Sequence, residues 1–285
     1  MNIIETQNLC YKYDDGTHAL NDVCVKIESG KTTAILGGNG AGKSTLFLNM
    51  NAVFKPTTGK VLYEGKEVNY NRKNILEMRK NIGLVFQDPD DQLFSASVKS
   101  DISFGVSNIG LPHEEIIARV EEAMRQTGTD VFADKPVHAL SFGQKKRVAI
   151  AGVLVMKPKV IILDEPTAGL DPNGVSELMH LLLKIKNENG VAIVIATHDI
   201  DLIPIYCDYA YILNKGNVTL EGTPESLFEQ PDLLRQNNLR LTRIAHLMEI
   251  LRDKDNIEFE NNATTISQAR TELLKVIKGE YYFEN

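Results

Sequence analysis

The chain has 285 residues, of which 43% are hydrophobic and 24% are charged, a balance typical of globular proteins that argues against extensive disorder. Its formal net charge of −7 argues against broad nucleic-acid binding, which depends on many contacts between basic side chains and phosphates. The length suits one large domain, or one domain with a smaller appendage.

The cysteines Cys10, Cys24 and Cys207 are far apart in the sequence and lack the spacing of a zinc site. We therefore expect reduced thiols in a cytosolic protein. The N-terminus has no basic segment followed by an apolar run, so no secretion signal is predicted. The longest apolar runs, at 148–156 and 191–196, are shorter than the ~20 residues of a membrane-spanning helix. We expect a soluble chain that acts at a membrane only through another protein.

Strands and helices alternate along most of the chain. Apolar patterning predicts strands at 22–30, 32–36, 59–65, 82–87, 159–166 and 191–196. Helical spacing predicts helices directly after residue 43 and at 114–127, 141–156 and about 174–188. A hairpin around Lys215 and Gly216 is predicted at 209–222. Repeated strand–helix alternation indicates an α/β fold with a parallel sheet.

The composition changes after residue 222. Thr223 and Pro224 predict a helix start, and a long amphipathic stretch follows with Leu239, Ile244, Leu247, Met248 and Leu251. A capping box of Thr265 and Gln268 begins a helix over 265–277. This last helix is expected to place Ile266, Ala269, Leu273 and Ile277 on one face. We predict a small C-terminal helical unit at 223–285 after a main domain at 1–222.

The stretch "GGNGAGKST" matches the phosphate-loop pattern G-x-x-x-x-G-K-[ST] and lies between a predicted strand and a predicted helix. Its glycines let backbone N–H groups surround phosphate oxygens. Lys43 supplies positive charge to the β- and γ-phosphates, and the Ser44 hydroxyl is a magnesium ligand. The predicted nucleotide-binding residues are Gly37, Gly38, Asn39, Gly40, Ala41, Gly42, Lys43, Ser44 and Thr45.

Two acidic residues end the apolar strand "VIILDEP". A carboxylate at the end of a buried strand is costly unless it binds a cation, so Asp164 is predicted to hold magnesium. Glu165 is placed to polarise the attacking water as a general base. Such a pair on its own would more often be a solvated strand end, but here it follows a phosphate loop.

A second anion site is predicted in "ALSFGQKKRVAI". The Ser141 hydroxyl and backbone N–H groups lie at a predicted helix N-terminus, which favours a bound phosphate. Because the chain already has a phosphate loop a hundred residues earlier, this second site raises the question of whose phosphate it binds.

The motifs "GGNGAGKST", "VFQDP", "LSFGQKKR", "VIILDEPTAGLD" and "ATHD" occur in this order, and residues 1–222 thereby resemble the ATP-binding cassette family. The resemblance implies a P-loop ATPase core with a mixed, largely parallel sheet, a helical subdomain at 88–157, and ATP with Mg²⁺ as ligands. It implies that Tyr13 stacks on adenine, that Gln87 contacts magnesium and the attacking water, and that His198 holds the γ-phosphate. The alternative for Tyr13 is an ordinary strand aromatic.

The same resemblance answers the question of the second anion site. In this family two cassettes pack head to tail, so Ser141, Gly143 and Gln144 would contact ATP bound by the partner, and Asp171 would contact the opposite subunit. The family pattern is usually LSGGQ, and Phe142 replaces its first glycine. We expect the site to work because Phe142 needs only a negative φ at a helix start.

Segments 87–98, 141–156 and 240–251 resemble the energy-coupling-factor importers, in particular the cobalt-import ATP-binding subunits of the CbiO type. This resemblance implies a peripheral ATPase at the cytoplasmic face of the cell membrane, with a second ATPase subunit, a membrane scaffold and a membrane substrate-binding component as partners. Asp88, Asp90 and Asp91 would pair with a basic helix of the scaffold, or else form a solvated turn. The C-terminal unit would join two ATPases, or else pack only on its own domain.

Related ATPases serve nickel importers and shared vitamin-uptake modules, so the cargo stays open between these and cobalt. A different class of function is a soluble scaffold ATPase of the kind that acts in iron–sulfur assembly.

Overall fold

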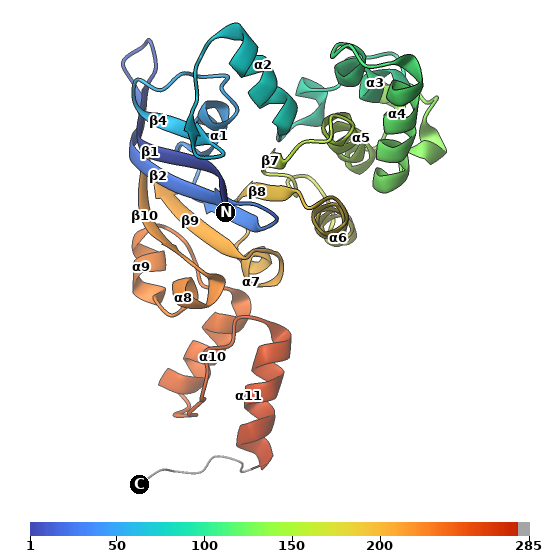
Figure 1. Ribbon diagram of the computed structural model, residues 1–285. Coiled ribbons are helices and arrows are strands. Elements are labelled where there is room, and N and C mark those ends of the chain that lie inside the picture. The colour runs from blue at the N-terminus through green and yellow to red at the C-terminus, as the bar shows by residue number, and fades with distance from the viewer. Residues whose placement is uncertain (279–285) are drawn as a thin grey trace.

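Figure 1 shows the computed structural model, which describes residues 1–278. An antiparallel sheet has the strand order β2-β1-β4-β5. Its strands are β1 (Asn2–Lys12), β2 (His18–Glu28), β4 (Thr58–Tyr63) and β5 (Lys66–Glu67). The sequence pattern did not predict β1, which pairs with both β2 and β4 and so lies inside this sheet.

The main sheet has the order β10-β9-β3-β8-β7-β6. Its strands are β3 (Thr32–Leu36), β6 (Ile82–Val85), β7 (Val160–Asp164), β8 (Ala192–Thr197), β9 (Tyr209–Asn214) and β10 (Asn217–Gly222). The pairs from β9 to β6 are all parallel, and only β10 runs antiparallel, through the predicted hairpin at Lys215 and Gly216. The predicted α/β fold with a mixed, largely parallel sheet is confirmed.

Helices connect and cover these strands. They are α1 (Lys43–Met50), α2 (Arg72–Asn81), α3 (Val98–Ser107), α4 (His113–Thr127), α5 (Phe142–Leu154), α6 (Pro172–Asn189), α7 (Ile203–Tyr206), α8 (Pro224–Phe228), α9 (Pro231–Gln236), α10 (Arg243–Asp253) and α11 (Ile266–Lys278). Short 3₁₀ turns lie at η1 (Pro89–Asp91), η2 (Asp130–Phe132), η3 (Val137–Ala139) and η4 (Ile200–Leu202). The sequence pattern missed α2 because Met78 is its single buried residue, which leaves little apolar periodicity to detect.

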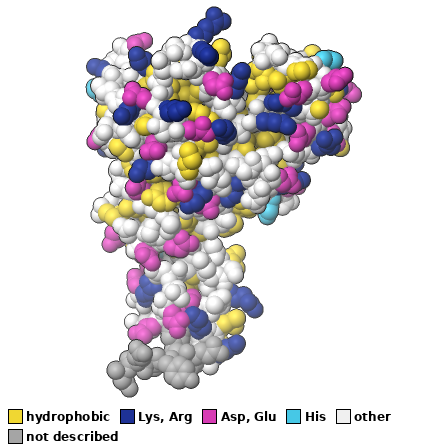
Figure 2. Space-filling model, in the orientation of Figure 1, with side chains coloured by type: hydrophobic (Ala, Val, Ile, Leu, Met, Phe, Trp, Pro, Cys, Tyr) yellow, Lys and Arg dark blue, Asp and Glu magenta, His cyan; other side chains and the backbone are white. Residues whose placement is uncertain are grey.

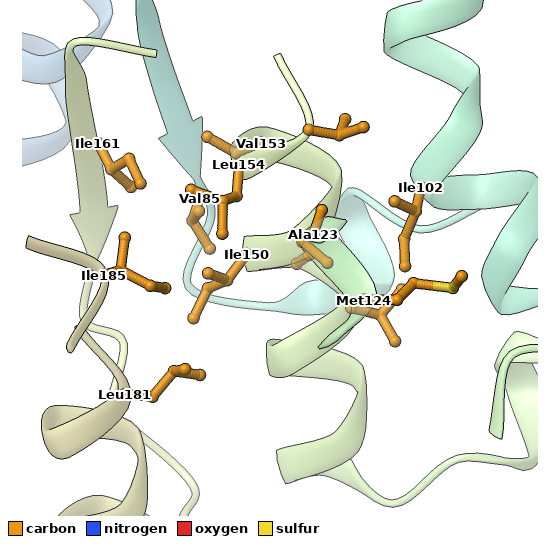
Figure 3. Close-up of a cluster of buried hydrophobic side chains, with 14 of the residues drawn as sticks. Val85, Ile102, Ala123, Met124, Ile150, Val153, Leu154, Ile161, Leu181 and Ile185 are labelled. Atoms are coloured by element: carbon orange, nitrogen blue, oxygen red, sulfur yellow. The ribbon is translucent and has the colours of Figure 1, made fainter. Parts of the chain in front are cut away.

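The main sheet separates two apolar clusters. Alternate residues of a strand point to opposite faces, and in β7 Ile161 and Leu163 face α5 and α6, whereas Val160 and Ile162 join α1 and the antiparallel sheet. Figure 3 shows Ile161 with residues of α5 and α6 in the first cluster, which extends to Ile102 of α3 and Met124 of α4. The helices of the predicted subdomain at 88–157 are thereby attached to the strand that ends at Asp164.

The C-terminal part divides into two packing groups. Residues of α8 and α9 share a cluster with β3 and β9, whereas α10 and α11 form a smaller cluster around Met248, Ala263 and Ala269. Figure 1 shows α10 and α11 projecting from the rest of the chain. Asp201 connects this projection to the main domain, since its carboxylate accepts bonds from the Arg240 side chain at 2.9 Å and the Arg243 N–H at 2.8 Å. The boundary at residue 222 stays a prediction.

The structure adds two details to the C-terminal expectations. Leu239 lies in the turn between α9 and α10 and not in an amphipathic helix, and it packs with the cluster of β3 and β9. Ile266 and Ile277 are exposed, because α11 buries Ala269 and Glu272 instead. The capping box of Thr265 and Gln268 is present, with both reciprocal bonds.

The contact between β6 and α5 gives a test of the packing. A Cβ on Gly83 would lie 2.0 Å from Cγ1 of Val153, whereas a Cβ on Gly152 meets nothing within 4 Å. We expect Gly83→Ala to lower the free energy of unfolding by about 1–3 kcal/mol through overpacking. The matched control Gly152→Ala is expected to raise it by up to about 1 kcal/mol, since alanine is the better helix former. Urea unfolding measures both, and equal effects of the two variants would contradict this packing.

Candidate nucleotide-binding and hydrolysis site

The phosphate loop, residues 37–45, joins β3 to α1. Gly42 caps α1 with φ +107, and a Cβ there would lie 2.6 Å from the Ala19 carbonyl oxygen, so the position requires glycine. The Lys43 ammonium donates to the carbonyl oxygens of Gly37 at 2.7 Å and Gly38 at 3.3 Å. The loop therefore curves around its own lysine at the N-terminus of α1, where backbone N–H groups favour an anion.

Oxygen ligands suitable for a magnesium ion meet next to this loop. The Ser44 hydroxyl donates to Oδ2 of Asp164 at 2.5 Å, although the two residues are 120 positions apart. Burial raises the pKa of the Asp164 carboxyl, and the bond from Ser44 and the charge of Lys43 oppose this shift. Within residues 1–278 no cluster of three or more His, Cys, Asp or Glu residues could hold a metal. A hydroxyl and one carboxylate still fit Mg²⁺, which keeps several waters and needs few protein ligands.

Glu165 is the buried carboxylate of the site, with 6% of its surface exposed. Its Oε2 lies 2.9 Å from Nδ1 of His198, and its Oε1 lies 3.5 Å from the Lys43 ammonium. Oε1 is buried and has no hydrogen-bond partner among the residues that the structure describes. One oxygen is thus held by the imidazole, while the other is a buried acceptor near the Lys43 ammonium that can still accept a hydrogen bond from a water molecule.

The backbone of Glu165 is in the left-handed region, at φ +44. Its N–H donates to the Ala196 carbonyl of β8 at 3.1 Å, and its carbonyl accepts from the Ala168 N–H at 3.1 Å. The turn after β7 is therefore fixed on both sides of the carboxylate.

Gln87 lies in an exposed position after β6. Its carbonyl oxygen accepts a bond from the Lys146 ammonium at 3.3 Å, and the same ammonium donates to the Glu165 carbonyl at 3.2 Å. Burial lowers the pKa of Lys146 to about 8, against the opposing charges of Asp88 and Glu165. Lys146 is a site residue that the sequence motifs did not indicate, although its four-residue spacing from Phe142 and Ile150 places it on the inner face of α5.

Tyr13 directly follows β1 and lies beside the phosphate loop. It lies between β1 and β2, because the strand β1, which the sequence pattern did not predict, precedes it. Its hydroxyl lies 2.9 Å from the Thr45 hydroxyl, and its ring meets Tyr11 and Phe54 edge to face at 5.1 and 5.9 Å. These contacts hold a ring that is 37% exposed next to α1.

The start of α5 is a capping box. The Gln144 N–H donates to the Ser141 hydroxyl at 3.3 Å, and the Ser141 N–H donates to Oε1 of Gln144 at 3.0 Å. The Gln144 side chain is therefore used within its own helix, and a Cβ on Gly143, at the second helical position, would lie 3.5 Å from Cδ2 of Leu170. Phe142 has a negative φ, as expected, and its ring packs on Gly169.

Asp171 likewise caps a helix, since its carboxylate accepts the Gly174 N–H at 2.7 Å at the start of α6. The structure thus brings Tyr13, Thr45, Lys43, Ser44, Asp164, Glu165 and His198 into one group. It places Ser141, Gly143, Gln144 and Asp171 at two other helix starts. No hydrogen bond joins Ser141 to the phosphate loop within residues 1–278.

Comparison with known proteins agrees with this geometry. The family model described as ABC transporter matches residues 20–168. The energy-coupling factor transporter ATP-binding protein EcfA3 of Clostridium perfringens is 56% identical over 94% of both chains. EcfA of Methanocaldococcus jannaschii is 50% identical over 98% of this chain and 99% of its own.

The chain belongs to the ABC transporter family.

Within that family it groups with the energy-coupling factor ATP-binding proteins, and it is an ATPase. The solved structure of CbiO1 from Clostridium perfringens, described as part of the ABC transporter complex CbiONQ, is 57% identical to this cassette with a TM-score of 0.77. It covers 87% of this chain and 99% of its own. A dimeric cassette, MJ0796, bound to ADP and phosphate after hydrolysis, is 28% identical with a TM-score of 0.70, covering 78% and 98%.

The placement of Tyr13 in this cassette predicts how its ring and hydroxyl divide their roles. We expect Tyr13→Ala to weaken ATP binding about tenfold, because a base stacked on an aromatic ring gains about 1–3 kcal/mol. Tyr13→Phe keeps the ring and removes only the bond to Thr45, so its affinity is expected to stay within about threefold of the parent. Calorimetric titration with ATP measures both constants. An equal loss in the two variants would assign the effect to the hydroxyl.

Proposed function

We propose that this ABC ATPase powers a membrane importer of cobalt ions, and that it binds and hydrolyses ATP between two cassettes packed head to tail. The observation that carries the hydrolytic part is the buried Glu165 carboxylate: His198 holds its Oε2, and its Oε1, near the Lys43 ammonium, has no hydrogen-bond partner among the described residues. In the proposed complex the phosphate loop (Gly37, Gly38, Asn39, Gly40, Ala41, Gly42, Lys43, Ser44 and Thr45) surrounds the phosphates and Tyr13 stacks on adenine.

Magnesium would be held by Ser44, Asp164 and Gln87, and when bound it neutralises charge on the phosphate oxygens. Lys43 already points its ammonium into the loop, where it can donate to phosphate oxygens. Glu165 accepts a proton from the attacking water through Oε1, while the oxygen of that water bonds to the γ-phosphorus. The bond from the γ-phosphorus to ADP breaks, and inorganic phosphate leaves. His198 holds Oε2 of Glu165 and reaches the γ-phosphate from its exposed position.

The head-to-tail arrangement gives the start of α5 its role. The capping box uses the N–H groups of Ser141 and Gln144, so the N–H of Gly143 is the group proposed to contact the γ-phosphate of the partner's ATP. Ser141 would bind beside it, and Asp171 would contact the opposite subunit from its helix cap. The dimeric state of the related cassette MJ0796 supports this arrangement.

Two variants test the shared site. Glu165→Gln is expected to abolish turnover and to give an ATP-bound dimer that persists, because the carboxylate acts only on the attacking water. Ser141→Arg is expected to abolish turnover while ATP affinity stays within about threefold, since an uncovered rim side chain adds little to binding. Size-exclusion chromatography with light scattering in ATP and calorimetric titration measure these effects.

The outcomes that contradict the shared site are distinct. A Glu165→Gln protein that stays monomeric in ATP contradicts the capping in trans. A Ser141→Arg protein that loses ATP binding would place Ser141 in the site of its own chain.

An exposed aromatic pair supports docking to a membrane scaffold. Phe94 and Phe104 are 68% and 53% exposed, and their rings meet edge to face at 4.8 Å. The carboxylate of Asp101 fixes the segment before α3 by accepting the N–H groups of Phe94 and Ser95 at 3.0 and 2.7 Å. Exposed large apolar side chains held in place like this are typical of protein-binding surfaces.

The acidic turn beside this pair is partly used within the chain. Asp90 forms a bidentate pair with Lys145 at 2.6 and 2.9 Å, and Asp88 caps η1 by accepting the Asp90 N–H. Asp91 is exposed. We therefore assign the proposed contact with a basic scaffold helix first to Asp91.

A peripheral position at the cytoplasmic face of the membrane follows from this docking. Within residues 1–278 no helix has the length and hydropathy needed to cross a bilayer. On the face seen in Figure 2, basic and acidic side chains are interspersed without a broad basic patch, so that face gives no support to a nucleic-acid partner. The second ATPase, either a copy of this chain or a sister subunit, is proposed to contact the exposed apolar side chains of α10 and α11, namely Leu247, Ile266 and Ile277.

Cobalt is proposed as cargo from the likeness to the CbiO type. The relatives named only as energy-coupling factor ATP-binding proteins favour a second candidate, a shared ATPase that serves vitamin or nickel importers. They give no support to a soluble scaffold ATPase of iron–sulfur assembly.

Purification of the tagged chain from detergent-solubilised native membranes tests the importer. We expect a scaffold and a cobalt-type substrate component to co-purify. Several vitamin-binding components would favour the shared ATPase, and soluble partners alone would contradict transport.

Because a docking hot spot contributes about 2 kcal/mol or more, Phe94→Ala is expected to lower scaffold recovery at least tenfold. Asp91→Lys should lower it as well, and exposed Glu121→Lys on α4 serves as the charge-matched control.

A further inference from the structure

Lys146 is a buried charge that the proposed reaction does not use. Only 3% of its surface is exposed. Its ammonium donates to the carbonyl oxygens of Glu165 at 3.2 Å and Gln87 at 3.3 Å, and it lies 5.1 Å from the centre of the Phe142 ring. The three groups come from the turn after β7, the segment after β6 and the first turn of α5.

These partners account for the direction of the side chain. An ammonium carries three N–H donors, and here two carbonyl oxygens and one aromatic face receive them. A buried charge costs free energy that a well-packed apolar residue at the same place avoids. Packing alone therefore does not explain a lysine on the inner face of α5, next to Ile150.

Each partner belongs to a segment of the proposed site. The side chain of Gln87 is the proposed magnesium and water contact, and Glu165 holds its carboxylate on a left-handed backbone at φ +44. Phe142 follows Ser141, and its ring lies 2.8 Å from where a Cβ on Gly169 would be. One ammonium thereby links the start of α5 to the backbones of both Gln87 and Glu165.

We propose that Lys146 is a positioning residue: it fixes the backbones of Gln87 and Glu165 to the start of α5, so that the helix end that contacts the partner's ATP moves together with the chain's own hydrolytic carboxylate. This inference rests on the function proposed for Glu165. It also gives Phe142 a role, because a glycine at that position would leave the ammonium without its third partner.

Steady-state ATPase kinetics of three lysine variants test this proposal. Lys146→Met is expected to lower kcat about 10- to 100-fold, as expected for lost bonds to a charged donor. KM for ATP is expected to stay within about threefold, because Lys146 touches neither the phosphate loop nor Tyr13. Lys146→Gln supplies two N–H donors for the two carbonyls and is expected to recover at least about tenfold of the lost kcat.

Lys159→Met is the matched control. Lys159 also lies over a ring, Tyr63 at 5.9 Å, and pairs with Glu64 at 2.6 Å. Its side chain is 50% exposed, so its removal is expected to leave kcat unchanged.

The results that overturn the proposal can be separated from a failure of the Glu165 role. Equal kcat in Lys146→Met and Lys159→Met, or equal losses of kcat and thermal stability in Lys146→Met and Lys146→Gln, would leave Lys146 a purely structural residue. If Glu165→Gln turns over ATP like the parent, the role of Glu165 fails first and the proposal fails with it.

If Lys146→Met does not fold, the variant Phe142→Leu is measured in its place. It removes the ring and keeps both carbonyl bonds, so we expect kcat to fall about threefold at unchanged KM, as for one lost cation–π contact. Unchanged kcat would overturn the part of the proposal that concerns Phe142.

Discussion

The parallel pairing of β3, β8 and β7 is the constraint on which the whole site depends. Leu36 at the end of β3 lies opposite Thr197 of β8, and Asp164 at the end of β7 lies opposite Ala196. Because parallel strands end at the same edge of a sheet, the loops that follow them begin side by side. Lys43, Glu165 and His198 each come shortly after one of these strand ends, and this is why Lys43 and His198, far apart in sequence, both face the buried carboxylate of Glu165.

The sequence predicted those parts of the molecule whose chemistry is contiguous. The phosphate loop, the Asp-Glu pair and the helix start at Ser141 each lie within a few neighbouring residues, and the structure has the predicted helix starts and strand end at these places. The sequence pattern could not predict the role of Lys146, because its ammonium binds two backbone carbonyls that are 59 and 19 residues away in the chain. The strand β1 and the position of Tyr13 were also missed, since they depend on pairing across the antiparallel sheet and not on local pattern.

The fold connects two separate groups of residues that are proposed to bind phosphate. One group lies at the strand ends, and the other lies at the start of α5, where Ser141 and Gln144 satisfy each other's backbone. The helix α5 packs against the main sheet through an apolar cluster that includes Ile150, Ile161 and Ile185, shown in Figure 3. A rigid helix on a rigid sheet transmits displacement at one end to the other, because close-packed interiors deform little.

The backbone of Glu165 has a consequence for how substitutions at this position are tolerated. A non-glycine residue in the left-handed region costs about 1–2 kcal/mol relative to a relaxed conformation. Glycine would remove this strain, so folding on its own would select against an acid at position 165. A glutamate at this position therefore lowers the free energy of unfolding relative to glycine. Such a cost is typical of functional sites, where a residue needed for activity can reduce stability. A design procedure that optimises stability alone would therefore favour replacing Glu165 by glycine, although hydrolysis is proposed to depend on this residue.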